Sequence, residues 1–336
     1  MARSRFVVAR MIALSVLVCG PALVASAASA QDGAGYPVEI ENCGRTLRFE
    51  EPPRRAVLSY HPVAEMFVGL GLADHAVGRA GFSGEPPLLP EQAEDFAKIP
   101  VVSDSVYPPP REQLLALRPD FLLAYGDFDH GAGSAQGLAT LEQLERAGVR
   151  VYSVTCPDPT GNYAGESLEA TYRSILDLGR IFGVEDRARE RVEQMRQQIA
   201  DVRARVEGLP PVEVIMYAGG EGPLDLSGGV GINNELLEAA GGANLFSEEG
   251  LYFQASLEAV AEEDPEAFVI FGDLAGPNGE LEATEASDFL FETFPNMRAS
   301  QDRRVVLTAF VYTAPGWRNA QTVEDLARQL HPEAFE

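Results

Sequence analysis

Apolar and polar positions follow two alternating patterns along the first half of the chain. Short apolar runs, typical of buried strands, are separated by segments in which apolar residues recur every three or four positions, as on one face of a helix. After a predicted hairpin at 36–53, the predicted strands are 55–60, 76–80, 99–102, 121–125 and 150–154. The helices predicted between them are 63–70, 111–117 and 135–147. This alternation predicts a mostly parallel sheet with helices on both faces.

The middle of the chain keeps a helical period without a single proline. The period runs from Glu166 to Glu207, with breaks expected near Gly179 and Gly183. The part from 185 to 210 carries a thin apolar stripe among many Arg and Glu residues, which predicts one long, largely solvated helix. Such a helix is either a peripheral surface element or a rigid connection between two lobes.

A second series of strands and helices begins directly after this helix. Its predicted strands are 212–217, 267–271 and 304–310, and its predicted helices are 234–240, 256–262, 287–293 and 319–330. The expected fold class is therefore α/β, with two Rossmann-like lobes joined by a single long α-helix. The expected lobes are 31–184 and 211–336, with the connecting helix at 185–210.

One element occurs once in each half, and it places a glutamate at the start of a short helix that ends at a proline before an apolar strand. In PREQLLALRPDFLLA, Glu112 precedes Pro119 by seven positions, and in SLEAVAEEDPEAFVIF, Glu258 precedes Pro265 by the same seven. As local structure, a carboxylate in this place stabilises the positive end of its helix. The repetition indicates two similar halves.

The N-terminal segment 1–30 predicts a secretory signal peptide. Three arginines precede an uncharged apolar run, and small residues lead to a cleavage site before Gln31. An uncleaved membrane anchor is the alternative, because the charge-free run could just span a bilayer. Cleavage before Cys19 would give a lipoprotein, although Val18 is not the small residue that such a site requires. We expect export to the periplasm, or to the cell surface if the chain is lipidated or its host has no outer membrane.

The composition and net charge of the chain exclude some classes of binding partner. The chain has 336 residues, of which 46% are hydrophobic, enough for the cores of two lobes. Removing the leader with its three arginines leaves 23 basic against 51 acidic side chains, a net charge of −28. A surface of this charge repels nucleic acid and anionic lipid, so neither is expected as a partner.

Two cysteines remain after the leader, Cys43 and Cys156. In an oxidising compartment we expect them to form a disulfide, and two unpaired buried thiols are the alternative. Two cysteines alone make a poor metal site, and neither has a second cysteine three positions away.

The motifs of common enzymes are missing from the sequence. It contains no GxSxG, HExxH or Walker motif and only four histidines, so no catalytic function is expected. Aromatic and arginine side chains instead follow the predicted strands, where α/β folds bind their ligands. The candidate ligand-binding residues are Tyr60, His61, Arg79, Tyr107, Tyr125, Tyr217, Trp317 and Arg318. His61 and His130 raise the alternative of a directly bound metal ion.

These features together resemble one family, the substrate-binding proteins of bacterial ABC importers for ferric siderophores, haem and cobalamin, of the helical-backbone, class III type. The resemblance covers about residues 37–335 and is carried by PVEIENCGRTLRFEEPPRRAV, AEMFVGLGL, EQLLALRPDFLLAY, AGGANLF, EAVAEEDPEAFVIF and LARQLHPEAF. In proteins of that family two α/β lobes are bridged by one long helix, and the ligand lies between the lobes.

The resemblance implies an exported monomer without a cofactor of its own. It would capture a ferric siderophore, so that the ligand carries Fe(III), and deliver it to an ABC permease in the cytoplasmic membrane. Glu112 and Glu258 match the glutamates that dock into arginines of the permease. Haem or cobalamin is the alternative ligand, with Tyr60, His61 or His130 as candidate axial ligands of haem. A zinc or manganese ion held by His61 and His130 is a further alternative.

Overall fold

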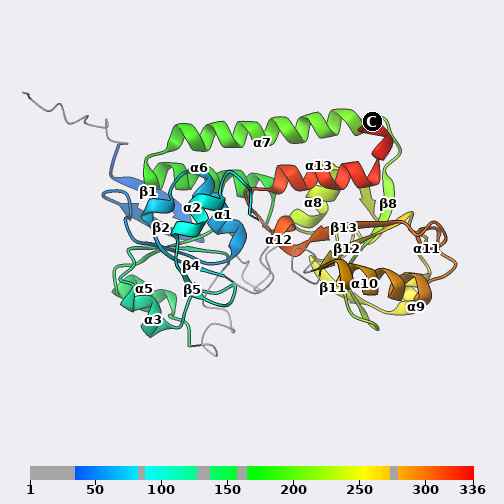
Figure 1. The fold of residues 1–336 in the computed structure, drawn as a ribbon, viewed down its shortest axis with the longest axis horizontal. Coiled ribbons are helices and arrows are strands. Elements are labelled where there is room, and N and C mark those ends of the chain that lie inside the picture. The colour runs from blue at the N-terminus through cyan, green and yellow to red at the C-terminus, as the bar shows by residue number, and fades with distance from the viewer. Residues whose placement is uncertain (1–34, 82–87, 127–136, 157–164, 273–278) are drawn as a thin grey trace, which may run out of the picture. The chain divides into compact units, whose positions relative to one another are not determined.

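Two separate sheets form the framework of the computed structural model (Figure 1). The structure describes residues 35–81, 88–126, 137–156, 165–272 and 279–336, and Ala34–Glu336 forms one compact unit. The predicted signal peptide lies outside the described residues. Within the described part of the chain, no helix is both long enough and apolar enough to cross a membrane.

The first sheet was predicted to be mostly parallel, and all of its strand pairs are parallel. Its strand order is β5 (Val101–Ser103), β4 (Ala76–Ala80), β3 (Ala56–Leu58), β6 (Phe121–Ala124) and β7 (Arg150–Ser153). The helices of this half are α1 (His61–Gly69), α2 (Ala93–Lys98), α3 (Arg111–Ala116) and α5 (Leu141–Arg146). Every residue of β3 and β6 is buried, which is why these strands read as continuous apolar runs rather than as alternating ones.

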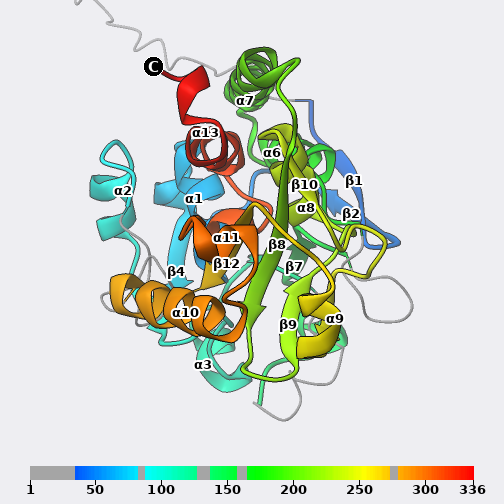
Figure 2. The same cartoon turned by 90° about the vertical axis from the view of Figure 1, so that its right-hand side faces the viewer.

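The second sheet is mixed. Its order is β11 (Tyr252–Ala255), β9 (Leu224–Ser227), β8 (Val212–Gly219), β12 (Ala267–Gly272) and β13 (Val305–Ala309), and β10 (Gly242–Asn244) also pairs with β8. Strand β9 pairs antiparallel with both of its neighbours, β8 and β11, and the other pairs are parallel. The helices of this half are α8 (Ile232–Ala239), α9 (Leu257–Ala261), α10 (Gly279–Thr293), α11 (Arg298–Gln301), α12 (Phe310–Thr313) and α13 (Asn319–Leu330). Figure 2 shows α13 end-on.

The centres of the two sheets have the same order. Strands β3, β6 and β7 are neighbours in the first sheet, and β8, β12 and β13 are neighbours in the second. The repeated glutamate-to-proline element precedes the middle strand in both cases, as α3 before β6 and α9 before β12. The fold is therefore mixed α/β with two similar halves, as the sequence predicted.

The helical stretch between the halves consists of two helices, α6 (Leu168–Phe182) and α7 (Glu185–Val206). Gly183 ends α6 with a left-handed backbone, φ +70°, which glycine adopts without strain. Gly179 was expected to be a break but lies inside α6, where a Cβ would come 2.5 Å from Cβ of Ala188. This glycine allows α6 and α7 to pack closely.

Helix α7 buries one narrow stripe and leaves the rest of its surface to solvent. The buried residues are Ala188, Val192, Met195, Ile199 and Val202. It packs against α6 and also against α13, near the C-terminus (Figure 1). The helix thus contacts elements that precede and follow it in the chain, and it ends at Val206, four residues earlier than predicted.

The predicted hairpin and the predicted disulfide are both present. Strands β1 (Val38–Asn42) and β2 (Arg45–Phe49) pair antiparallel, and Cys43 in their turn is bonded to Cys156, with the Cα atoms 5.2 Å apart. Two hydrogen bonds between Asn42 and Ser153, of 2.8 and 2.9 Å, join the hairpin to β7 beside the bridge. The bridge spans 113 positions and is worth about 4–5 kcal/mol in the chain-entropy model.

Several predicted bounds were wrong. Helix α5 begins at Leu141, α10 begins at Gly279 rather than 287, and the strand predicted to reach Phe310 ends at Ala309, where α12 follows. Strands β9, β10 and β11 and helices α2, α11 and α12 were not predicted. These elements have three to six residues, too few for a hydrophobic period to be recognised.

Candidate functional site

Aromatic side chains gather at the C-terminal ends of the strands of the first sheet. Tyr60 follows β3 and Tyr125 follows β6, and their ring centroids are 4.9 Å apart. Tyr60 has φ +58° and ψ 136°, a backbone conformation that side chains with a Cβ rarely adopt and that costs about 1–3 kcal/mol. The strain is compatible with a conformation fixed for binding, because strained residues concentrate at ligand sites.

A buried carboxyl adjoins these rings. Glu166 is 8% exposed and lies just before Ser167, the N-cap of α6, and Tyr125 donates its hydroxyl hydrogen to Oε1 of Glu166 at 2.9 Å. Burial raises the pKa of Glu166 to about 7, although the hydrogen bond from Tyr125 works in the opposite direction. Burial and the nearby carboxylate also raise the pKa of Tyr125, so its phenol stays protonated at neutral pH.

The second half contributes side chains to the same place. Tyr252 of β11 is 50% exposed, and the Glu166 carboxylate contributes to the raised pKa of its hydroxyl, after desolvation by surrounding protein atoms. Asn233 of α8 donates to that hydroxyl at 2.9 Å, and the Tyr252 ring lies 6.3 Å from the ring of Phe310, which directly follows β13. We call the five side chains that connect the sheets the inter-sheet cluster: Tyr60, Tyr125, Glu166, Tyr252 and Phe310.

A second set of contacts joins the halves through buried charge. Arg318, just before α13, donates from Nε to both carboxylate oxygens of Glu65 at 2.8 and 2.9 Å, and its Nη2 also bonds to Oε1. His61 Nε2 lies 3.1 Å from the same Oε1. Glu65 and His61 are 2% and 1% exposed. Glu235 of α8 reaches in the opposite direction and accepts the backbone N–H of Leu168 at the start of α6, at 2.7 Å.

Two of the predicted ligand residues are therefore in the inter-sheet cluster and two are in the buried charge network. The cluster contains Tyr60 and Tyr125, and the network contains His61 and Arg318. Arg79 of β4 lies with its guanidinium 5.0 Å from the ring centroid of Phe96.

The other predicted ligand residues have different surroundings. Tyr107 is 39% exposed in the segment after β5, and the hydroxyl of buried Tyr217 donates to the carbonyl of Gly220 at 2.8 Å. The Trp317 ring is covered by the guanidinium of Arg191 at 4.4 Å and lies against Gly69 of α1, where a Cβ would overlap it. His130 lies outside the described residues.

Three members of the inter-sheet cluster were not predicted from the sequence. Glu166 follows β7 by more than ten positions, and Tyr252 stands in an edge strand that was not predicted. Phe310 was assigned to the end of a strand, although it is the first residue of α12. The rule that ligands lie beyond the carboxyl ends of parallel strands would have selected Phe310 if the end of β13 had been known.

The match to known proteins covers most of the described unit. The family model for periplasmic binding proteins matches residues 56–312. The chain belongs to the periplasmic binding protein family. These proteins bind substrates for ABC transporters and are not enzymes.

Relatives of this periplasmic binding protein are recognised along the whole chain. It is 22% identical over 331 residues to the uncharacterised ABC transporter substrate-binding lipoprotein YvrC of Bacillus subtilis, covering 97% of this chain and 96% of that one. It is 26% identical over 218 residues to the vitamin B12-binding protein of Yersinia pestis, covering 64% and 69%.

Solved structures show the same two-lobe fold. An ABC-type Fe3+-hydroxamate transport system from Saccharomonospora viridis matches with a TM-score of 0.69 and 25% identity, covering 88% of this chain and all of that one. A periplasmic haem-binding protein from Pseudomonas aeruginosa matches with a TM-score of 0.62 and 27% identity, covering 83% and 93%. The chain is therefore similar to binding proteins for siderophores, haem and cobalamin.

The two repeated glutamates of this periplasmic binding protein are both exposed, in the first turns of α3 and α9. Ser256 caps α9 by accepting the N–H of Ala259 at 3.2 Å. Hydrogen bonds from its own backbone N–H and from Ser256 lower the pKa of Glu258, which therefore remains ionised at neutral pH.

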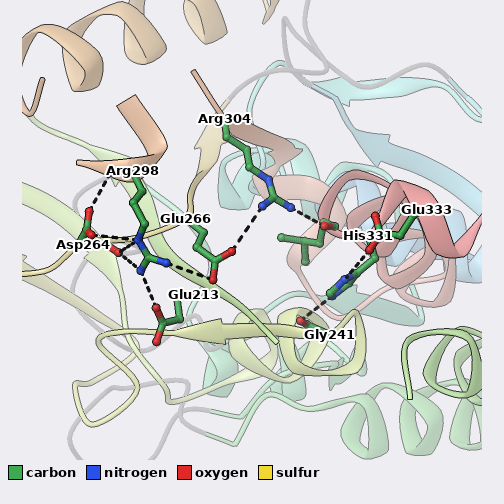
Figure 3. Close-up of polar contacts among 9 residues, drawn as sticks. Glu213, Gly241, Asp264, Glu266, Arg298, Arg304, His331 and Glu333 are labelled. Carbon is green, nitrogen blue, oxygen red and sulfur yellow. Dashed lines mark hydrogen bonds and ion pairs between the residues drawn. The ribbon is translucent and has the colours of Figure 1, made fainter. Parts of the chain in front are cut away.

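An arginine fixes the turn after each of these helices. Arg55 donates to the carbonyls of Leu117 and Arg118 at the end of α3, at 2.6 and 2.9 Å. Arg298 contacts the side chain of Asp264, after α9, at 3.0 Å and the side chain of Glu213, in β8, at 2.7 Å (Figure 3). The two exposed carboxylates thus stand on equivalent, similarly supported helices.

Figure 3 also shows how the end of α13 is attached to this sheet. Arg304 donates to the carbonyl of Leu330 at 2.5 Å, and buried His331 hydrogen-bonds through Nε2 to the carbonyl of Gly241 at 2.9 Å. His331 therefore has a structural role.

Proposed function

We propose that this periplasmic binding protein captures a ferric siderophore between its two sheets and delivers it to an ABC permease. The observation that carries the proposal is the inter-sheet cluster, in which phenol and phenyl rings from both halves are linked from Tyr60 through Glu166 to Phe310. Aromatic faces and a few polar groups are the usual lining of a site for a large, partly apolar ligand. The resemblance to the Saccharomonospora viridis ferric-hydroxamate system supports the same ligand class.

Export, a monomeric state and docking through Glu112 and Glu258 belong to the same proposal. An exposed carboxylate on each half offers two points of electrostatic contact, which fix the orientation of a docked protein. The protein would work in the periplasm, or at the cell surface if lipidated.

Haem is the second candidate. The phenol of Tyr60 stands at the start of α1 beside Tyr125, and a haem-binding protein of Pseudomonas aeruginosa is 27% identical to this chain. A directly bound zinc or manganese ion has less support, because His61 contacts the Glu65 carboxylate that pairs with Arg318. Among the described residues, no three His, Cys, Asp or Glu side chains are grouped to hold a metal ion.

Equilibrium titration of the mature protein tests the proposal. The ligands are ferric trihydroxamate and tricatecholate chelates, haem, cobalamin, Zn²⁺ and Mn²⁺, with intrinsic fluorescence as the signal. We expect a Kd of about 1 μM or below for at least one ferric chelate, and weaker binding of all the others. Tight binding of haem, cobalamin or a bare ion without binding of any ferric chelate would overturn the proposal.

A further inference from the structure

Glu166 is an unusual group to find among the rings of a ligand site. The residue is 8% exposed, and its carboxyl accepts a hydrogen bond from Tyr125. Among the described residues no arginine or lysine shifts its pKa, which burial raises to about 7. Near neutral pH this carboxyl is therefore divided between its neutral and ionised forms. A cation brought close to it would favour the ionised form.

Among the described residues, the groups that interact with Glu166 are phenols rather than cations. Burial raises the pKa of both Tyr125, after β6, and Tyr252, of β11, so these two phenols are neutral at physiological pH. The ring of Tyr60, after β3, lies 4.9 Å from that of Tyr125, and Asn233 of α8 donates a hydrogen bond to the hydroxyl of Tyr252. The remaining charged side chains at the start of α6 are already engaged. Glu169 pairs with Arg196 at 3.1 Å, and Glu235 accepts the N–H of Leu168.

The two arginines among the predicted ligand residues, which could bind an anionic ligand, have other partners. Arg318 is bound by Glu65 through both carboxylate oxygens, and Arg79 lies over the ring of Phe96. An anionic ligand placed beside Glu166 would keep that carboxyl protonated or be repelled by it. The mature net charge of −28 opposes an anionic ligand at longer range as well.

We propose that Glu166 is a specificity-determining residue, which makes the site select ferric chelates of the hydroxamate class that are uncharged or cationic and reject anionic catecholate chelates. This inference rests on the proposed function, that the ligand is a ferric siderophore. A cationic substituent of the chelate gains a charge-assisted interaction with the ionised carboxyl, and an uncharged chelate does not.

The selection depends on pH. Above pH 7 Glu166 is ionised, and affinity for a cationic chelate is highest. As the pH falls below 7 the carboxyl takes up a proton, and this advantage is lost, whereas affinity for an uncharged chelate changes little. Binding of the cationic chelate below pH 7 therefore releases a proton from Glu166.

The test uses matched chelates that differ only in charge. A linear ferric trihydroxamate with a free ammonium group, its N-acetylated derivative and a ferric tricatecholate are titrated into the mature full-length protein at pH 5.5 and pH 8.0. For the wild type we expect the ammonium chelate to bind about tenfold more tightly than the acetylated one at pH 8.0, with the preference largely lost at pH 5.5. The tricatecholate should bind most weakly.

Variants assign the effect to one carboxyl. Glu166→Gln should remove the preference at pH 8.0 and still bind the acetylated chelate, which also shows that the variant is folded. Glu169→Gln, at an exposed neighbouring position, should behave as the wild type. Tyr125→Phe removes the hydrogen bond that favours the ionised carboxyl, so the pH at which the preference appears should rise.

The results of these titrations distinguish a failure of the role assigned to Glu166 from a failure of the proposed siderophore-binding function. An unchanged preference in Glu166→Gln, or tight binding of the tricatecholate, overturns the role of Glu166 while the protein remains a siderophore-binding protein. Failure of all three ferric chelates to bind, with tight binding of haem or cobalamin, overturns the proposed function itself.

Discussion

Glu65 is a carboxylate on a buried helix face, and its partner lies 253 positions further along the chain. Removing a carboxylate and a guanidinium from water costs several kcal/mol each, which their attraction offsets only with good geometry. The two Nε contacts of 2.8 and 2.9 Å provide that geometry. No local sequence pattern reveals such a partner, so the pattern around Arg318 predicted only a ligand-binding role and did not indicate its pairing with Glu65.

Replacing only one partner of this pair should destabilise the fold more than is expected from the net stability that the pair contributes, because the other charge stays buried. Glu65→Gln removes the carboxylate charge that Glu65 presents to the guanidinium of Arg318, whose side chain is 13% exposed, and we expect a loss of about 3–5 kcal/mol in the free energy of unfolding. Arg318→Met should cost a similar amount, and the double variant less than the sum of the two. Urea unfolding at pH 7 measures all three.

A matched exposed pair provides the control for that cycle. Glu94 lies 3.8 Å from Lys98 with its side chain 92% exposed, so Glu94→Gln should change stability by less than about 1 kcal/mol. Additive losses for Glu65→Gln and Arg318→Met would contradict the assigned coupling.

Of the side chains predicted to follow strands and face a ligand, some come together in the structure and others do not. Tyr60 and Tyr125 follow buried strands whose apolar runs are visible in the sequence, and the structure brings their rings together. Tyr217 also ends an apolar run, but it lies within β8 and its hydroxyl is used inside the same half. The sequence indicates which residues are near strand ends, but the direction of each side chain depends on strand length and register.

At the scale of elements, the short helices α3 and α9 were predicted to within a residue at each end. Helix α3 begins directly after Pro110 and α9 directly after the capping residue Ser256, and a proline follows each helix; these signals act within a few positions. The long helical stretch was harder, because Gly179 looks like a break but serves close packing against Ala188. Only the tertiary contact distinguishes these two uses of glycine.

The equivalence of α3 and α9 leads to a prediction about transport. Glu112→Ala combined with Glu258→Ala should reduce uptake of a radiolabelled ferric chelate by more than about tenfold, because two-point docking to the permease is lost. Affinity for the chelate should not change, since both carboxylates are exposed in helices that precede their strands. Uptake is measured in cells that carry the cognate permease.

The control for docking is a carboxylate at a third helix start. Asp186 lies in the first turn of α7 with its side chain 100% exposed, and Asp186→Ala should leave uptake unchanged. Loss of chelate affinity in the double variant, or normal uptake by it, would contradict docking through these residues.

At the scale of the whole molecule, the sequence predicted two similar α/β halves because each half repeats the same local patterns. The shared central order of the two sheets confirms that similarity. The interactions that join the halves were not predicted: the contacts of Glu65 with Arg318 and of Glu235 with Leu168, and the electrostatic interaction of Glu166 with Tyr252. They connect distant segments, and their energies come from burial that only the assembled fold creates.

The central claim is that one ferric chelate contacts side chains of both halves. The most direct test is the affinity of Tyr60→Ala, in the first half, and of Phe310→Ala, in the second, for a ferric trihydroxamate chelate. Each variant should lose at least about tenfold in affinity, because each removes an aromatic face from the site. Tyr217→Phe, which removes only an internally bonded hydroxyl, should bind as the wild type does. Normal affinity in either alanine variant would contradict a ligand held between the two sheets.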